Sequence, residues 1–429
     1  MQLTLATDRS LIRAAGHSVR YLHCRLQAPP APTDRTRLPL DLALVLDRSG
    51  SMGGAKWACA RDTARQMLER LDARDRAALV VYDDHIDTLL ELCAVDAGAR
   101  AQAQRALAAI GPRGTTNLSE GWLTGCGLIG QTSPEERLRR CFLLTDGLAN
   151  AGITEAAELA THAGALRQLG VVTHTFGVGD DFDEALLGTL ADAGGGVFHD
   201  LADAERIGPI LTRELGDALA VVCAEARVWL HWEADLQVAA LGPWRQEADG
   251  RALSVWLGDL VSEQEQDLLL AVTFPAGDAE ATCPLRVRVT DATGQELASA
   301  SLHWTWARHS ANDRQPRNRD VDRLVAAYHA NLARRDAALA NRQGDFAQAQ
   351  QRLKAVARRI RGYAGDDAEL NGIVQSLTSD SEVHAAPLAP REAKERYYAA
   401  ASQTKGRTES GERRRKEGRT VSPDSAKET

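Results

Sequence analysis

The stretch that decides the fold reads DLALVLDRSGSM and runs from Asp41 to Met52. After Asp41 come five apolar residues, as expected for a strand that helices cover on both faces. Small and polar residues follow directly, from Asp47 to Met52. Open α/β sheets bind their ligands beyond the carboxyl ends of the strands, so a functional site is expected at this junction.

Apolar strands alternate with amphipathic helices over residues 37–220. Strands are predicted at 41–46, 77–82, 141–145 and 171–176. The helix after the first strand carries Trp57, Ala60, Ala64 and Met67 on one side, which is a 3.6-residue period. This alternation predicts a doubly wound, mostly parallel sheet of the α/β class.

The rest of the chain is predicted to form four further parts. Two short strands in residues 1–36 are expected to join a β-sandwich formed by residues 221–308, where short alternating runs are separated by turns. Six of the eight tryptophans lie in this region, as core and rim or, alternatively, as a sugar-binding platform. Residues 318–378 are predicted to form a helical hairpin, and 379–429 a mostly disordered polar tail.

Composition narrows the class of protein. The chain has 429 residues, 44% of them hydrophobic and 26% charged, and no run approaches the roughly 18 apolar residues of a membrane span. Seven cysteines without a Cys-x-x-Cys pair or an export signal indicate reduced thiols in a cytoplasmic protein. The net charge of −8 disfavours nucleic acid as the main partner. The basic run at 413–416 is interpreted as solubilising, with contact to nucleic acid or anionic lipid as the alternative.

Three pieces of sequence carry oxygen side chains that can converge. Asp47, Ser49 and Ser51 follow the first strand, Thr116 lies in a Gly-Thr-Thr-Asn segment, and Asp146 ends a later strand. Hydroxyl and carboxylate oxygens suit Mg²⁺, Mn²⁺ or Ca²⁺ rather than Zn²⁺ or copper. The sequence therefore predicts a metal site formed by these five residues. The alternative is that the serines cap the next helix and Asp146 closes a turn.

These pieces, in this order, resemble the metal-ion-dependent adhesion site of the von Willebrand factor A (VWA) domain family. The resemblance covers about residues 37–220, and the flanking strands and sandwich extend it, to bacterial intracellular members, as far as about residue 308. It implies that hydroxyls contact the ion, that the carboxylates act largely through water, and that an acidic residue of a partner completes the coordination. The implied function is metal-dependent protein binding by a scaffold protein, without catalysis.

The resemblance also implies partners, because related domains are often associated with MoxR-type AAA+ ATPases or with metal chelatases. A MoxR-type ATPase is therefore the expected partner. One alternative is a subunit of a chelatase-like, ATP-driven complex, although only about 36 residues precede the domain, where such subunits carry an AAA+-like or acidic region. Another is a metal-assisted hydrolase with Asp83 or Asp84 as general base.

Further acidic residues and histidines have competing interpretations. Asp83, Asp84 and Asp87 follow a strand and are interpreted as a solvated turn, with a second cation site as the alternative. The eleven histidines form no His-x-His or His-Glu-x-x-His pattern. His174, within a predicted strand, is therefore interpreted as a core residue rather than a ligand.

Overall fold

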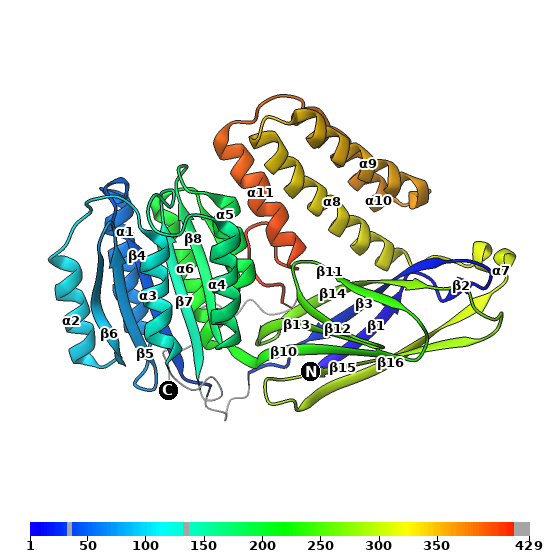
Figure 1. Ribbon diagram of the computed structural model, residues 1–429, viewed down its shortest axis with the longest axis horizontal. Coiled ribbons are helices and arrows are strands. Elements are labelled where there is room, and N and C mark those ends of the chain that lie inside the picture. The colour runs from blue at the N-terminus through cyan, green and yellow to red at the C-terminus, as the bar shows by residue number, and fades with distance from the viewer. Residues whose placement is uncertain (32–36, 132–136, 416–429) are drawn as a thin grey trace. The chain divides into compact units, whose positions relative to one another are not determined.

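The computed structural model describes residues 1–31, 37–131 and 137–415. Contacts divide the chain into two compact units, whose elements are labelled in Figure 1. The first unit joins Met1–Thr33, Val222–Val325 and Ser402–Thr429, and the second joins Asp34–Val221 with Ala326–Ala401. Within the described ranges, no helix is both long and apolar enough to cross a membrane.

The second unit is built around a six-stranded sheet with the order β6-β5-β4-β7-β8-β9. Five strands run parallel, and β6 pairs antiparallel with β5 at one edge. The strands are β4 Leu40–Asp47, β5 Arg76–Tyr82, β6 Ile86–Ala94, β7 Leu138–Thr145, β8 Val171–Val178 and β9 Gly195–Leu201. Every residue of β4, β7 and β8 is buried. The predicted α/β class with a mostly parallel sheet is confirmed.

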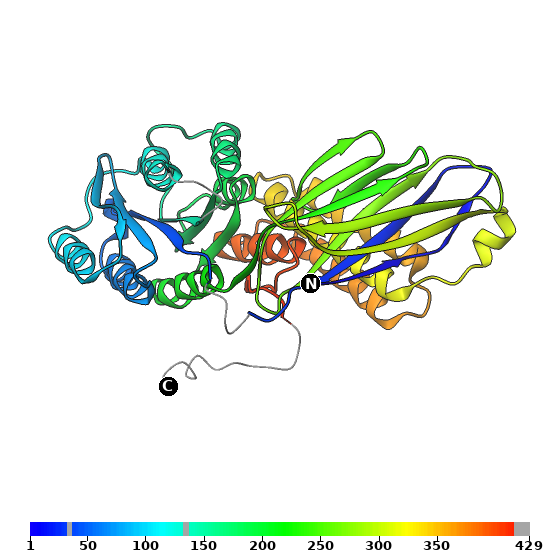
Figure 2. The same cartoon turned by 90° about the horizontal axis from the view of Figure 1, so that it is seen from below.

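Helices cover both faces of this sheet, as Figure 2 shows. They are α1 Ala55–Arg70, α2 Ala97–Ala108, α3 Leu118–Gly130, α4 Ala156–Gln168, α5 Glu184–Ala193 and α6 Ile207–Leu219, with the short 3-10 helices η1 Gly50–Met52 and η2 Ala204–Arg206. Helix α1 packs beside α2 and α6, whereas α3, α4 and α5 share the other face. On that face Trp122 and Cys126 of α3 pack with Val45 and Leu143 of the sheet.

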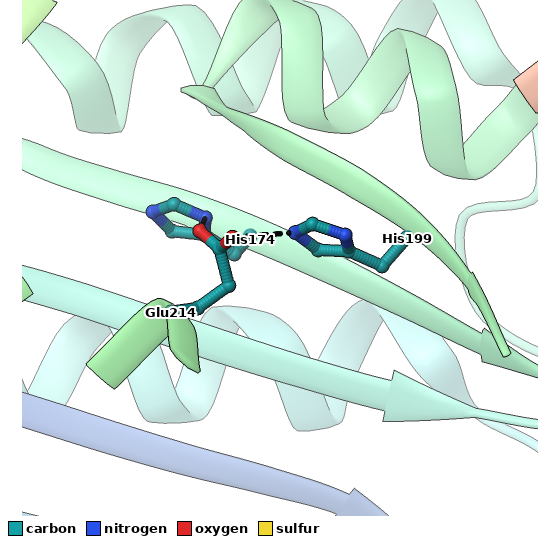
Figure 3. Close-up of side chains that lie close together, drawn as sticks. All are labelled: His174, His199 and Glu214. Carbon is teal, nitrogen blue, oxygen red and sulfur yellow. Dashed lines mark ion pairs between the residues drawn. The ribbon is translucent and has the colours of Figure 1, made fainter. Parts of the chain in front are cut away.

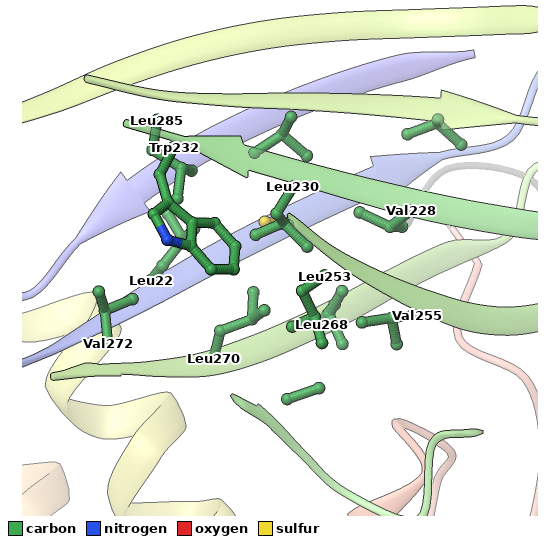
Figure 4. Close-up of a cluster of buried hydrophobic side chains, with 14 of the residues drawn as sticks. Leu22, Val228, Leu230, Trp232, Leu253, Val255, Leu268, Leu270, Val272 and Leu285 are labelled. Atoms are coloured by element: carbon green, nitrogen blue, oxygen red, sulfur yellow. The ribbon is translucent and has the colours of Figure 1, made fainter. Parts of the chain in front are cut away.

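The first unit is a sandwich of two sheets, with the orders β1-β3-β14-β11 and β12-β13-β10-β15-β16-β2. Its strands are β1 Gln2–Thr7, β2 Leu11–Arg13, β3 Ser18–Gln27, β10 Val221–Trp232, β11 Gln237–Leu241, β12 Arg245–Asp249, β13 Ala252–Val261, β14 Glu265–Phe274, β15 Thr282–Thr290 and β16 Glu296–Ala307. Side chains from both sheets, including Leu22, Leu230, Leu268 and Leu285, form one apolar core (Figure 4). The N-terminal strands are therefore part of the sandwich.

The tryptophans of the sandwich serve packing. Trp304 is fully buried in the core, whereas Trp229 and Trp256 are half-buried. The guanidinium of Arg227 lies 3.9 Å from the ring centre of Trp229 and 3.7 Å from that of Trp256. Because an arginine covers both rings, they do not offer an open stacking platform for a sugar.

Helices follow the sandwich: α7 His309–Arg314, α8 Arg319–Arg342, α9 Phe346–Ala364, α10 Ala368–Val383 and α11 Pro390–Thr404. Helices α8, α9 and α10 enclose an apolar cluster that includes Leu353, Ile360 and Leu377. Gly344 and Asp345 separate α8 from α9, and α10 begins at Ala368, so the range 318–378 that was predicted as a helical hairpin contains the start of a third helix.

The prediction of a mostly disordered tail from 379 is wrong for the end of α10 and for α11. Tyr397 and Tyr398 of α11 join the core of the sheet unit. Arg391 binds Asp200 at 2.8 Å, and Lys394 of α11 also forms an ion pair with a buried glutamate of α5. Two buried tyrosines and ion pairs with distant partners thus order this largely polar helix. Residues 416–429 of the predicted tail lie outside the described residues.

Candidate metal centre

The first predicted ligand loop begins where β4 ends. Asp47 is fully buried, and its carboxylate accepts hydrogen bonds from the Ser49 N–H at 2.8 Å and from the Thr145 hydroxyl at 2.7 Å. Burial raises the pKa of Asp47 to about 6, although these hydrogen bonds oppose the shift; the nearby Asp146 raises it further. A cation beside two buried carboxylates would favour their ionised forms.

Three predicted ligands form a continuous chain of oxygen atoms. Ser49 Oγ lies 3.0 Å from Ser51 Oγ, and Ser51 Oγ donates to Oδ1 of Asp146 at 2.7 Å. Asp146 follows β7, which is the parallel neighbour of β4 in the sheet. Asp146 is fully buried, whereas Ser51 is exposed. The oxygen cluster is therefore anchored inside the domain and open to solvent at Ser51.

Thr116 reaches the same edge of the sheet on the loop between α2 and α3. This loop is held to the first one by a hydrogen bond from the Gly50 N–H to the Gly114 carbonyl at 3.2 Å. A methyl group built on Gly147 would lie 3.4 Å from Thr116 Oγ1 and 3.8 Å from Ser51 Oγ, so both hydroxyls border the same small space. The structure thus brings all five predicted residues to the carboxyl edge of β4 and β7.

The close approach of the Thr116 loop requires a glycine at position 114. Gly114 has a φ of +68°, and a Cβ there would lie 2.0 Å from Oδ1 of Asp84. Any other side chain would meet both a strained backbone and a steric clash.

Helix capping does not account for the two serines. Ser49 stands at the N-cap of η1 but makes no side-chain capping hydrogen bond, and Gly54, which has no side chain, stands at the N-cap of α1. Their hydroxyls instead face each other and the carboxylate of Asp146. The two serine hydroxyls thus take part in the oxygen cluster and not in a helix cap.

Of the acidic residues after β5, Asp84 and Asp87 have largely exposed side chains, as predicted for a solvated turn, but Asp83 differs. Asp83 is fully buried and forms ion pairs with Arg48 at 2.9 Å and with Arg113 at 2.8 Å. Burial would raise the pKa of Asp83, but the hydrogen bond from Arg113 and the two positive charges hold it below its usual value. Arg48 also contacts Asp87. Asp83 therefore fastens two ligand loops together and, being held by two arginines, is unsuited to a second cation site.

Sequence reasoning also missed a basic neighbour of the site. Lys56, in the first turn of α1, donates from Nζ to Oδ2 of Asp146 at 2.5 Å. Its charge compensates part of the negative charge that Asp47 and Asp146 concentrate here. Because a lysine carries no oxygen donor, the pattern of predicted ligands contains no signal for this residue.

The donor set fits a hard divalent cation. Asp47 and Asp146 supply carboxylates, and Ser49, Ser51 and Thr116 supply hydroxyls, with neither nitrogen nor sulfur among these five donors. Such a set favours Mg²⁺, Mn²⁺ or Ca²⁺ over softer metals. An α/β domain with oxygen side chains gathered at its strand ends is typical of cation-dependent adhesion domains.

The comparison with known families agrees with this class. A sequence model of the von Willebrand factor type A domain matches residues 41–213. Residues 41–213 therefore form a von Willebrand factor type A domain, which confirms the resemblance seen in this part of the sequence. Domains of this family typically serve adhesion or interaction, and they bind a divalent metal at the corresponding site.

Relatives and solved structures place the domain in its wider context. The protein sll0103 of Synechocystis sp. is 28% identical over 277 residues, which cover 62% of this chain and 64% of that protein. YfbK of Escherichia coli is 23% identical over 194 residues, covering 45% of this chain and 33% of YfbK. The chain thus spans less than two thirds of the length of these curated relatives.

A solved von Willebrand factor type A structure from Catenulispora acidiphila matches with a TM-score of 0.67 at 16% identity, covering 92% of this chain and 89% of that chain. The ArnB paralog VWA2 from Sulfolobus acidocaldarius matches with a TM-score of 0.56 at 16% identity, covering 89% and 97%. These likenesses show that the fold is shared well beyond the adhesion domain itself.

Proposed function

We propose that this chain is a protein-binding module that captures an acidic side chain of a partner protein through Mg²⁺. The ion would be held by Asp47, Ser49, Ser51, Thr116 and Asp146, which are called the strand-end site below. The observation that carries this proposal is the oxygen chain from Ser49 through Ser51 to Asp146, buried at one end and open to solvent at the other.

The carboxylates, hydroxyls and neighbouring arginines of the site would have different roles in recognition. Asp47 and Asp146 provide the negative charge, and the hydroxyls provide neutral donors that leave the site able to accept an anionic group. When bound, the ion supplies a positive charge, and a glutamate or aspartate of the partner would complete its coordination. The exposed Ser51 marks the side from which that carboxylate would approach. The paired arginines around Asp83 keep the two loops in register.

The alternatives receive less support from the site. A hydrolase needs a general base near the ion, but Asp83 is engaged by two arginines and its pKa is held down, which makes it a poor base. All seven cysteines, each within the described part of the chain, are free thiols, which supports a reducing compartment such as the cytoplasm. A MoxR-type ATPase is the partner class that the experiment below would test first.

The experiment is capture of partners from a lysate of the source organism by the immobilised full chain. It is run in Mg²⁺ and in EDTA, with Thr116→Ala as the site variant and Thr161→Ala as the matched control. Thr161 is exposed on α4 and bonds the Ala157 carbonyl of its own helix, so the control removes the same atoms outside the site. Calorimetric titration with Mg²⁺ is made on the same three proteins.

A partner that is retained by the wild-type chain and by Thr161→Ala in Mg²⁺, but lost in EDTA and with Thr116→Ala, is the expected result. An ATPase in that fraction would identify the expected partner class. Capture that is insensitive to both EDTA and Thr116→Ala would overturn the metal-bridge mechanism. Turnover of a phosphate or carboxylate ester that is lost with Thr116→Ala would establish the hydrolase instead.

A further inference from the structure

A second set of metal-ligand side chains lies inside the sheet unit, away from the strand-end site. His174 of β8, His199 of β9 and Glu214 of α6 point toward one another, as Figure 3 shows. Their exposed fractions are 6%, 0% and 2%, and one ligand atom from each lies within 4.8 Å of the others. Three elements thus direct two imidazoles and one carboxylate into a single buried point.

The distances in this cluster have the spacing of metal ligands. Glu214 Oε2 lies 3.5 Å from Nδ1 of His174, and Oε1 lies 3.2 Å from Nε2 of His199. A charge-assisted hydrogen bond would bring such atoms to about 2.8 Å. Two ligands of a tetrahedral zinc ion, with bonds of about 2.0–2.1 Å, are about 3.3 Å apart. Both observed distances lie closer to the zinc spacing.

The surroundings make a cation favourable there. The ring of Phe142 packs edge-on to His174 at 5.2 Å, and Phe176 stacks on His199 at 5.1 Å. These rings keep water away, so the carboxylate of Glu214 is costly to bury without nearby positive charge. Arg213 contributes some of that charge, with Nε 3.9 Å from Oε1. A divalent ion between the three side chains would add positive charge beside the same carboxylate.

A hydroxyl orients one of the two imidazoles. The hydroxyl of Tyr398, on α11, lies 3.2 Å from Nδ1 of His199. When Nδ1–H donates to this oxygen, Nε2 carries its lone pair toward Glu214, which is the form that a metal requires. Such a partner on the second ring nitrogen is the usual companion of a histidine ligand.

We propose that His174, His199 and Glu214 form a buried zinc site, called the histidine–glutamate site. Two nitrogen donors and one carboxylate form a set that zinc accepts and that Mg²⁺ does not favour, so the two sites select different metals. The ion would join the edge strand β9 to β8 and to α6. This site stands independently of the proposed binding function.

The test measures metal in the intact protein. The full chain is produced in medium containing Zn²⁺, purified in EDTA, and its zinc is determined by mass spectrometry. About one zinc per chain is expected in the wild type, in Thr116→Ala and in Glu158→Gln, which is an exposed control on α4. Glu214→Gln keeps the side-chain volume and is expected to lower the zinc content at least tenfold.

If Glu214→Gln fails to fold, X-ray absorption at the zinc edge of the wild-type protein tests the proposal without a variant. Nitrogen and oxygen neighbours at about 2.0–2.1 Å support the site. Sulfur neighbours at about 2.3 Å would place the metal on cysteines and overturn the proposal. A zinc-free wild-type chain, or a folded Glu214→Gln variant that retains its zinc, would overturn it as well.

Discussion

The strand-end site and the histidine–glutamate site belong to the same domain but are built in different ways. The first gathers oxygen atoms on loops, three of them from the short run Asp47–Ser51, and it opens to solvent at Ser51. The second gathers side chains from two strands and a helix, and all three are buried. One site is formed largely by a local segment, whereas the other exists only when the sheet and α6 are packed.

Because of this difference, substitutions in the two sites should affect different properties of the protein. Loop residues at the edge of a sheet can be altered with little loss of packing, so their variants should affect binding. Buried polar residues in a core depend on one another, so their variants should affect the free energy of unfolding. Four measurements test this expectation.

The largest effect is expected for Glu214→Ala in metal-free buffer containing EDTA. The change removes the central carboxylate of a buried cluster and leaves a cavity, so the free energy of unfolding should fall by about 3 kcal/mol. Urea unfolding followed by circular dichroism measures it, with the exposed Glu158→Ala as the matched control. A loss below about 1 kcal/mol would show that the cluster does not support the core.

Next in size is the effect of Thr116→Ala on cation binding. The loss of one hydroxyl ligand should weaken Mg²⁺ binding about thirtyfold, equivalent to about 2 kcal/mol. The free energy of unfolding without metal should change by less than about 1 kcal/mol, because the loop is held by backbone hydrogen bonds. Calorimetry and urea unfolding separate the two quantities. A variant that binds Mg²⁺ normally but unfolds easily would reverse the comparison.

A third measurement concerns His329, a histidine outside both sites. It separates the contribution of this residue to the loss of stability in acid from that of the two sites. Burial, together with the charge of Arg359, lowers the pKa of His329 in α8 to about 4, against about 6.5 in the unfolded chain. Between these values the unfolded chain binds more protons, so stability falls as the pH falls from 6.5 toward 4. After allowance for solvent near the ring, His329→Gln should reduce the loss between pH 7 and 5 by about 1 kcal/mol.

Urea unfolding at pH 7, 6 and 5 measures this slope. The exposed His231, changed to Gln, is the matched control. An unchanged slope in His329→Gln would assign the acid sensitivity to other groups, the histidine–glutamate site among them.

The smallest effect is expected for Lys56→Met. Lys56 pairs with the carboxylate of Asp146, so its positive charge competes with a bound cation. Removal of that charge should tighten Mg²⁺ binding about threefold, since the amine is partly exposed and solvent screens it. Weaker Mg²⁺ binding in this variant would show that Lys56 positions Asp146 rather than competing for it.

The sequence alone determined the fold class and indicated the residues of the strand-end site. Alternating apolar strands and helices predict a parallel sheet, and parallel strands end at the same edge. Polar residues that follow β4 and β7 must therefore meet, whatever the details of packing. This is why Asp47, Ser51 and Asp146 could be grouped before their contacts were known.

Which charged and aromatic side chains pair across the fold became visible in the three-dimensional structure. Asp83 reads as part of a solvated turn but is buried between two arginines, and the polar helix α11 is ordered by Arg391 and Lys394. His174 reads as an isolated core residue but lies beside His199 and Glu214. Such pairs join separate elements, so neither periodicity nor motif spacing encodes them. They form because packing removes these side chains from water, and a buried charge is stable only beside a compensating neighbour.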